Sequence, residues 1–290
     1  MRNFLKYKTL YFFISALFLV PGIIALFLWG FNPSIDFTGG TLWQIEFAPE
    51  FENSADEIKA FLEESGHTVH TVQSLDGKSF LLKLSPLDET QKEEIKTGLS
   101  EKFTVFAEKS FETVGPVLGQ ELLEKTIMAI VLTAGFIMLY VAWRFKNKMY
   151  GICAILAMFH DTFILLGAFS LLGHFYGVEV DTLFVTAVLM MLSFSVHDTV
   201  VVYDRIRELK RIHHKESFEN VVNQAIGDTI VRSINNSLTL IFMLLALLFL
   251  GGETIRWFVV ALLVGTIAGT YSSTFTAAPL LVVWYNRAKK

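Results

Sequence analysis

Six long runs of apolar residues divide the chain. Each run is close to the roughly 20 residues that a helix needs to cross the hydrocarbon core of a bilayer. The runs are residues 10–30, 126–143, 150–172, 182–203, about 230–250 and 257–284. The pattern therefore predicts a membrane all-α bundle of six transmembrane helices. The first run follows the basic residues Arg2, Lys6 and Lys8, as the apolar part of a secretion signal would. It is longer than the apolar part of such signals, so we expect a retained helix.

Residues 31–125 have a different pattern, with short elements that alternate in type. Ser54 is suited to cap one helix, and Asp76-Gly77 is typical of a hairpin turn between two strands. The expected elements are a strand at 41–47, a helix at 55–64, strands at 68–75 and 79–84, a helix at 88–102 and a strand at 103–114. The order β-α-β-β-α-β predicts an α+β ferredoxin-like domain between the first two transmembrane helices. The chain then divides into 1–30, 31–125 and 126–290.

The positive charges predict how the chain is oriented in the membrane. Lys and Arg gather before the first run, at 144–149, at 204–233 and at the C-terminus, whereas the short loops 173–181 and 251–256 hold only Arg256. By the positive-inside rule both termini lie in the cytoplasm, and 31–125 is extracytoplasmic or periplasmic. We expect 204–229 to be a cytoplasmic loop, with a short amphipathic helix at 216–227 on the membrane surface.

The composition narrows the class of function. The chain is 53% hydrophobic and has one cysteine, Cys153, which cannot form an internal disulfide. No set of nucleophile, base and orienting group is visible, and no phosphate-binding loop. We therefore expect a transport or binding protein without a cofactor, not an enzyme, and no nucleic-acid partner. His67 and His70 are read as surface histidines, and no metal site is expected.

Polar residues inside the apolar runs are the candidate functional groups, because burying them in lipid is costly. Asp198 lies in the cytoplasmic third of the fourth run, and Arg232 lies at the cytoplasmic start of the fifth. A carboxylic acid balanced between burial and a nearby cation can load and release a proton. The alternative interpretation is an Asp that packs helices together and an Arg that lies at the membrane interface.

Three further residues are secondary candidates. Asp161 lies midway along the third run next to His160, and His197 precedes Asp198. Asp161 is either a second proton site or a hydrogen-bonding link between helices, and we favour the link. The pairs His160-Asp161 and His197-Asp198 also suggest an alternative function, proton-coupled efflux of a small substrate or a metal. A passive membrane scaffold is a third hypothesis.

Several motifs resemble those of the SecD/SecF family of protein-export membrane proteins, within the resistance-nodulation-division superfamily. Residues 34–41, SIDFTGGT, are similar to the family's GIDFTGGT, with Ser34 in place of Gly. Residues 114–122, VGPVLGQEL, resemble VGPxxGxEL, and His160-Asp161 resembles the family's HD on the third helix. Residues 196–208 resemble the fourth-helix motif, with His197 where Asn is usual.

The resemblance implies a subunit of the Sec translocase in the bacterial inner (cytoplasmic) membrane. With a SecD-like subunit it would use the proton-motive force to promote translocation of unfolded preproteins through the SecYEG channel, with YajC and YidC as further candidate partners. The resemblance also implies that Asp198 and Arg232 form a proton-relay pair, with a further Asp supplied by the SecD-like partner.

Overall fold

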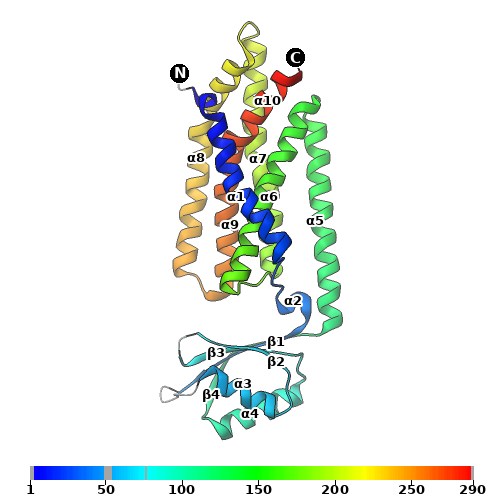
Figure 1. The fold of residues 1–290 in the computed structure, drawn as a ribbon, viewed down its shortest axis with the longest axis vertical. Helices are drawn as coiled ribbons and strands as arrows, with labels where there is room; N and C mark the ends of the chain where they lie inside the picture. The colour runs from blue at the N-terminus through cyan, green and yellow to red at the C-terminus, as the bar shows by residue number, and fades with distance from the viewer. Residues whose placement is uncertain (1–2, 49–53, 76, 289–290) are drawn as a thin grey trace. The chain divides into compact units, whose positions relative to one another are not determined.

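The computed structural model describes residues 3–48, 54–75 and 77–288. The chain forms two compact units, one made of residues 33–127 and the other of the chain on either side of them. The larger unit is helical and the smaller one is built on a β-sheet (Figure 1). Each unit is described by itself.

Six helices of the chain are long and apolar enough to cross a membrane, as the hydrophobic pattern predicts. A 3₁₀ turn, η1 (Phe4–Tyr7), precedes the first, and a π-helical segment, η2 (Ser273–Ala277), interrupts the last. The long helices are α1 (Lys8–Leu28), α5 (Pro116–Arg144), α6 (Lys148–Tyr176), α7 (Thr182–Ile212), α8 (Phe218–Leu250) and α9 (Glu253–Ser272), which continues through η2 into α10 (Ala278–Ala288).

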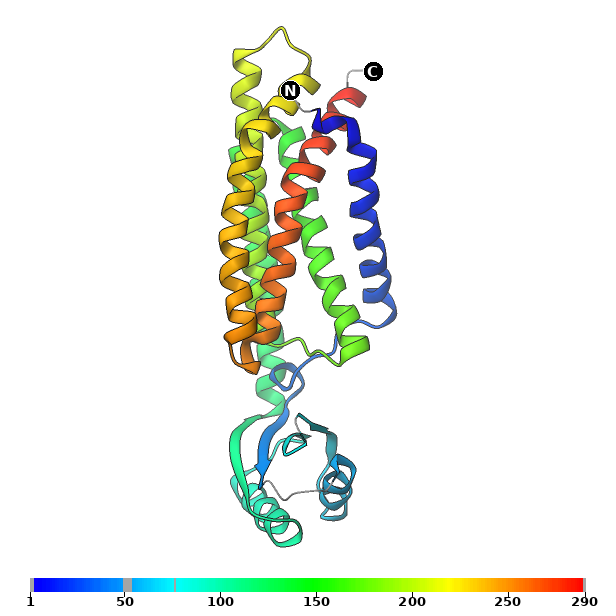
Figure 2. The same ribbon diagram turned by 90° about the vertical axis from the view of Figure 1, so that its left-hand side faces the viewer.

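Helices α6 and α7 are more enclosed than α1, α5 and α8. In Figure 2, α6 lies between α1 and α9. Small residues let neighbouring helices approach closely. A Cβ atom at Gly22 of α1 would lie only 3.1 Å from the Cα of Gly167 on α6. Gly265 of α9 likewise leaves no room for a Cβ atom beside Met191 of α7. Close packing of α1, α6, α7 and α9 therefore fixes the centre of the bundle.

The two ends of the described chain lie at the same end of the helical unit (Figure 1). In η1, the backbone N–H of Phe4 donates to Oδ1 of Asn223, in the first turns of α8, over 2.6 Å. This arrangement agrees with an even number of crossings.

The small unit contains one antiparallel sheet with strand order β2-β3-β1-β4. Capping boxes begin both of its longer helices, at Ser54 with Glu57 and at Asp88 with Gln91. The elements are α2 (Ile35–Thr38), β1 (Gly40–Phe47), α3 (Ala55–Glu64), β2 (Val69–Ser74), β3 (Ser79–Leu84), α4 (Glu89–Lys102) and β4 (Phe106–Val114). Trp43, Ile58 and Leu99 belong to its fully buried core. From β1 onward, the order of strands and helices is the one expected from the sequence, and the short helix α2 is an additional element.

Two parts of the chain differ from the sequence expectation. The expected loop 204–229 is mostly helical, because α7 continues to Ile212 and α8 begins at Phe218 with Ser217 as its N-cap. The amphipathic segment is the first part of α8, where Val221 and Val222 are buried. Helix α5 begins at Pro116, before the expected residue 126, since Pro suits the first turn of a helix. In the expected hairpin turn, Asp76 lies outside the described residues.

Candidate functional site

Asp198 lies on α7 with its side chain turned into the bundle, and the residue is 7% exposed. Its Oδ2 atom accepts hydrogen bonds from two serine hydroxyls on other elements. Ser233 of α8 donates over 2.5 Å and Ser273 of η2 donates over 2.8 Å. One carboxyl oxygen therefore connects α7 to two other parts of the bundle.

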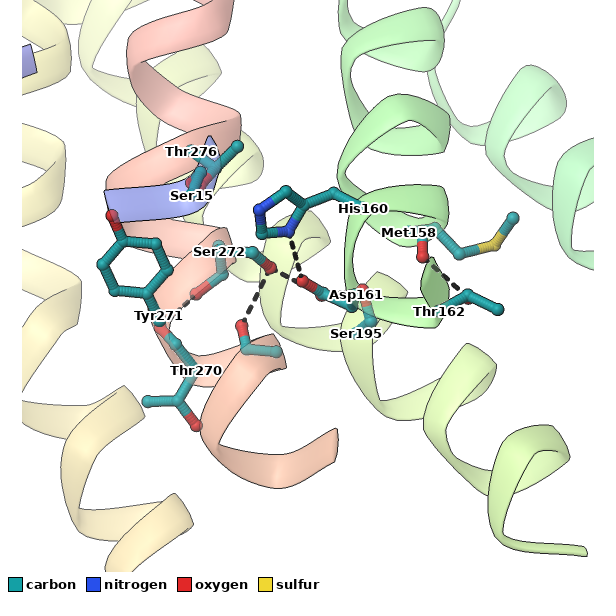
Figure 3. Close-up of polar contacts among 12 residues, drawn as sticks. Ser15, Met158, His160, Asp161, Thr162, Ser195, Thr270, Tyr271, Ser272 and Thr276 are labelled. Atoms are coloured by element: carbon teal, nitrogen blue, oxygen red, sulfur yellow. Dashed lines mark hydrogen bonds and ion pairs between the residues drawn. The ribbon is translucent and has the colours of Figure 1, made fainter. Parts of the chain in front are cut away.

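Asp161 on α6 is surrounded in a similar way and is 3% exposed. Its Oδ2 accepts from Ser195 of α7 and from Ser272 of α9, each over 2.6 Å. Its Oδ1 lies 2.9 Å from Nδ1 of His160, which is also buried. Figure 3 shows the carboxyl group of Asp161 between these partners. Three helices thus meet at this side chain.

Two consecutive serines link the two carboxyl groups. Ser272 ends α9 and donates to Asp161, while Ser273 begins η2 and donates to Asp198. Single π-turns inside α-helices are often found at functional sites. The place where the last span departs from α-helical geometry is thus the place where it contacts both acids.

Neither acid has a Lys or Arg partner among the residues that the structure describes. Within the described part of the chain, the only ion-pair geometry at either group is that of Asp161 with His160, which is charged only when protonated. Burying a charge without a counter-ion is costly, and hydroxyl donors offset part of that cost. Since serine hydroxyls can turn to donate or to accept, the same pockets can hold the ionised or the protonated acid. This is the chemistry of a proton-binding site.

Arg232 does not contact Asp198 in this structure. The guanidinium group forms no ion pair with any described residue, and the residue is exposed on α8. Its neighbour Ser233 is the residue that reaches the acid. Adjacent residues on a helix point about 100° apart, so the two side chains leave α8 in different directions. The pairing of Arg232 with Asp198 stays a prediction.

Two other cations near this end of α7, Arg205 and Arg144, are paired with acids. Arg205 contacts Asp228 of α8 through Nε and Nη2, over 2.8 and 2.6 Å, and Glu208 over 2.7 Å. Arg144 of α5 forms an ion pair with Asp204. These ion pairs connect α5, α7 and α8 at the end of the bundle that is rich in Lys and Arg.

His197 lies apart from the two acid pockets. The residue is exposed and lines a groove of about 370 Å³ between α7 and α5, beside Tyr140 and Val200. Across 3–48, 54–75 and 77–288, no group of three or more His, Cys, Asp or Glu side chains is arranged to hold a metal ion.

Sequence reasoning identified both acids and His160 but not the serines that position the acids. Ser233, Ser272 and Ser273 are small residues of a kind common in membrane helices. The signal that could have found them is Ser272-Ser273, two adjacent hydroxyls in an apolar run. The π-helical geometry that directs them to two different acids is not visible in the sequence.

Two family models match the chain. "Protein export membrane protein SecD/SecF, C-terminal" matches residues 94–287, and "SecD/SecF GG Motif" matches residues 24–50. The first covers most of the helical unit and the second covers the glycine motif before β1.

Relatives of similar length carry the same family name. The chain is 42% identical to "Protein translocase subunit SecF" of Thermobaculum terrenum, over 99% of this chain and 95% of that protein. It is 38% identical to "Protein translocase subunit SecF" of Anaerolinea thermophila, over 98% and 94% of the two chains.

A solved structure agrees over nearly the whole chain. It is the crystal structure of SecDF, described as a translocon-associated membrane protein, from Thermus thermophilus. The TM-score is 0.83 at 35% identity, and the match covers 98% of this chain but only 39% of the SecDF chain. Taken together, these matches show that the chain belongs to the SecD/SecF family of protein-export membrane proteins.

Proposed function

We propose that this chain couples the proton-motive force to protein translocation by protonating and deprotonating Asp198. Protein transport as a translocase subunit follows from the family and from relatives of nearly equal length. The use of the proton gradient is the part that we infer from the site.

The observation that carries the proposal is the hydrogen bonding of Asp198. A buried acid held by Ser233 of α8 and Ser273 of η2 connects three segments at one oxygen. Adding a proton removes the charge that these hydroxyls stabilise, so the preferred arrangement of the segments changes. Each proton that crosses a potential of 100 mV releases about 2.3 kcal/mol, which is enough to bias such a change.

Arg232 is the cation that we assign to the second state of this site. It is exposed one residue before Ser233, so a modest rotation or shift of α8 would bring it toward Asp198. We propose that the ionised acid attracts Arg232 and that protonation releases it. The two states of α8 would then transmit the proton cycle to the rest of the molecule.

The proposed partner is a SecD-like subunit, because this chain matches only part of a fused SecDF protein. That subunit would supply a further acid to the relay, and the complex would act beside SecYEG, with YajC and YidC as candidate neighbours. We place the protein in the inner membrane with both termini in the cytoplasm. The 33–127 unit would then be an extracytoplasmic ferredoxin-like domain that contacts the unfolded preprotein.

An export assay with inverted membrane vesicles tests the proposal. Asp198→Asn keeps the shape of the side chain but cannot exchange a proton, so proton-gradient-dependent export should fall to the level seen with an uncoupler. Asp228→Asn is the matched control, since Asp228 is an exposed acid paired with Arg205, and it should retain most export. Export by Asp198→Asn that still responds fully to the gradient would contradict the proposal.

A further inference from the structure

We propose that His160 and Asp161 form a second proton-binding site, and that Ser272 and Ser273 couple its occupancy to that of Asp198. The pair lies inside the bundle, on a helix other than the one that carries Asp198. The existence of the site stands on its own geometry. Only its coupling to Asp198 rests on the function proposed above.

The contact between His160 and Asp161 can hold a proton in two ways. Their Nδ1 and Oδ1 atoms lie 2.9 Å apart, within hydrogen-bonding distance. Either Nδ1–H donates to an ionised carboxylate, or a protonated carboxyl group donates to Nδ1. Ser195 and Ser272 both contact the other oxygen, so they stabilise the charge in the first arrangement.

The second ring nitrogen of His160 shows where another proton can be accepted. Its Nε2 has no hydrogen-bond partner among the described residues. The atom is buried, and the residue as a whole is only 8% exposed. Buried polar atoms are rarely left unpaired, and those that are deserve a functional explanation. Figure 3 shows the imidazole ring with one nitrogen toward Asp161 and the other directed away from it. When Nδ1–H donates to Asp161, Nε2 is therefore the atom of the cluster whose lone pair is left to accept a proton.

The link to the first site is the junction between α9 and η2. Ser272 and Ser273 are neighbours in the chain, and each donates to a different buried acid. When Asp161 takes up a proton, Ser272 loses a charged acceptor and the local backbone is freer to move. Such a movement alters the position of Ser273, and hence the free energy of protonating Asp198. Coupling of this kind is reciprocal.

Few other charges surround the pair. On the elements packed against α6, cationic side chains lie toward the helix ends. Besides these cations, the titratable residues farther along α6 or on the packed elements α1, α7, α9 and α10 are Tyr11, Tyr150, Cys153, His174, Tyr176, His197, Asp198, Tyr203, Asp204, Glu208, Glu253, Tyr271 and Tyr285, while η2 has none. The hydroxyls of Tyr203 and Tyr271 already donate to the carbonyl oxygens of Ala277 and Tyr11. Asp198 is thus the acid best placed to respond to His160 and Asp161.

Infrared difference spectroscopy of the full-length protein in liposomes, titrated with acid, tests the site directly. The wild type should show two protonated-carboxyl bands that Asp161→Asn and Asp198→Asn remove one at a time. In Ser272→Ala, the midpoint of the Asp198 band should shift by about fivefold or more in proton concentration, the lower end of typical coupling. Ser193→Ala, an exposed serine on α7, should leave both midpoints in place.

The histidine is tested with a pair of substitutions. In His160→Asn the amide nitrogen replaces Nδ1 and nothing replaces Nε2, whereas His160→Gln places its amide nearer to Nε2. We expect His160→Asn to keep the Asp161 band and to slow its exchange in D₂O at least several-fold. Equal exchange in wild type and His160→Asn would show that Nε2 is not the entry point.

The outcomes separate the two proposals. An Asp161 group that shows no titrating band across the accessible pH range would overturn the second site. A titrating Asp161 band with an Asp198 midpoint unchanged in Ser272→Ala would overturn the coupling. If Asp198 never titrates while Asp161 does, the proposed function is contradicted and the second proton site still stands.

Discussion

At the scale of single residues, the main feature is that hydroxyl groups, not cations, hold the buried acids. Ser233 and Ser273 hold Asp198, while Ser195 and Ser272 hold Asp161. A permanent ion pair would keep an acid ionised. Serine donors can turn, so they permit both the charged and the neutral form and suit a group that gains and loses protons.

Removing one donor should therefore weaken the function without abolishing it. In Ser273→Ala the acid keeps Ser233 but loses one of two donors, each worth about 1.5–3 kcal/mol when it serves a charged group. We expect gradient-dependent export to fall about tenfold. The double variant Ser233→Ala with Ser273→Ala should approach the loss seen in Asp198→Asn. Wild-type export rates in the double variant would mean that the two hydroxyls do not position Asp198.

At the scale of elements, two glycine motifs that are far apart in sequence contact each other in the small unit. Gly39 has φ = +73°, and a Cβ atom there would lie 2.8 Å from the Cα of Pro116. Gly119 of α5 would meet the backbone N of Gly39 at 2.9 Å if it carried a Cβ atom. The motifs at 34–41 and 114–122 thus form one joint between β1 and α5, which requires glycine on both sides.

Substitution at this joint should be destabilising. Gly39→Ala adds a clash with Pro116 to the cost of about 1–2 kcal/mol for a non-glycine residue in the left-handed region. Gly66 has a similar φ of +84° but open space around it, so Gly66→Ala reports the backbone cost alone. The melting temperature of the detergent-solubilised protein should fall clearly more for Gly39→Ala. Equal falls would show that the contact with Pro116 does not contribute.

A second close approach is the one between α1 and α6. At Gly167 a Cβ atom has no room beside the backbone of Gly22, whereas Gly135 on α5 has nothing within 4 Å. Gly167→Ala should lower the melting temperature because the two helices must separate. Gly135→Ala should raise it or leave it unchanged, since Ala favours the helix. A Gly167→Ala protein as stable as the wild type would contradict the packing described here.

The sequence predicted elements well wherever local pattern decides them. The six apolar runs, the alternation of strands and helices in the small unit, and the cap Ser54 each depend on nearby residues. The amphipathic helix at 216–227 was predicted, but its continuation into the fifth span as one helix was not, because Phe218 and Val221 are buried inside the bundle and do not lie on a membrane surface. The serine–acid contacts join residues up to 111 positions apart, so the local sequence can mark Ser272-Ser273 as candidates but cannot show which acid each serine contacts.

At the scale of the whole molecule, the chain matches a part of SecDF and is about as long as the SecF relatives. Helix α5 has large exposed apolar side chains such as Val131, Phe136 and Leu139. Exposed apolar side chains are expected where a helix faces lipid or another membrane subunit. This agrees with a chain that works together with a SecD-like partner.

The most direct test of the central claim is proton flux through the protein assembled with its SecD-like partner in liposomes. With a membrane potential imposed and a pH-sensitive dye inside, the wild-type complex should take up protons faster than empty liposomes. The Asp198→Asn complex should take them up at the rate of empty liposomes, and Asp228→Asn should behave like the wild type. Proton uptake by Asp198→Asn at the wild-type rate would contradict the account.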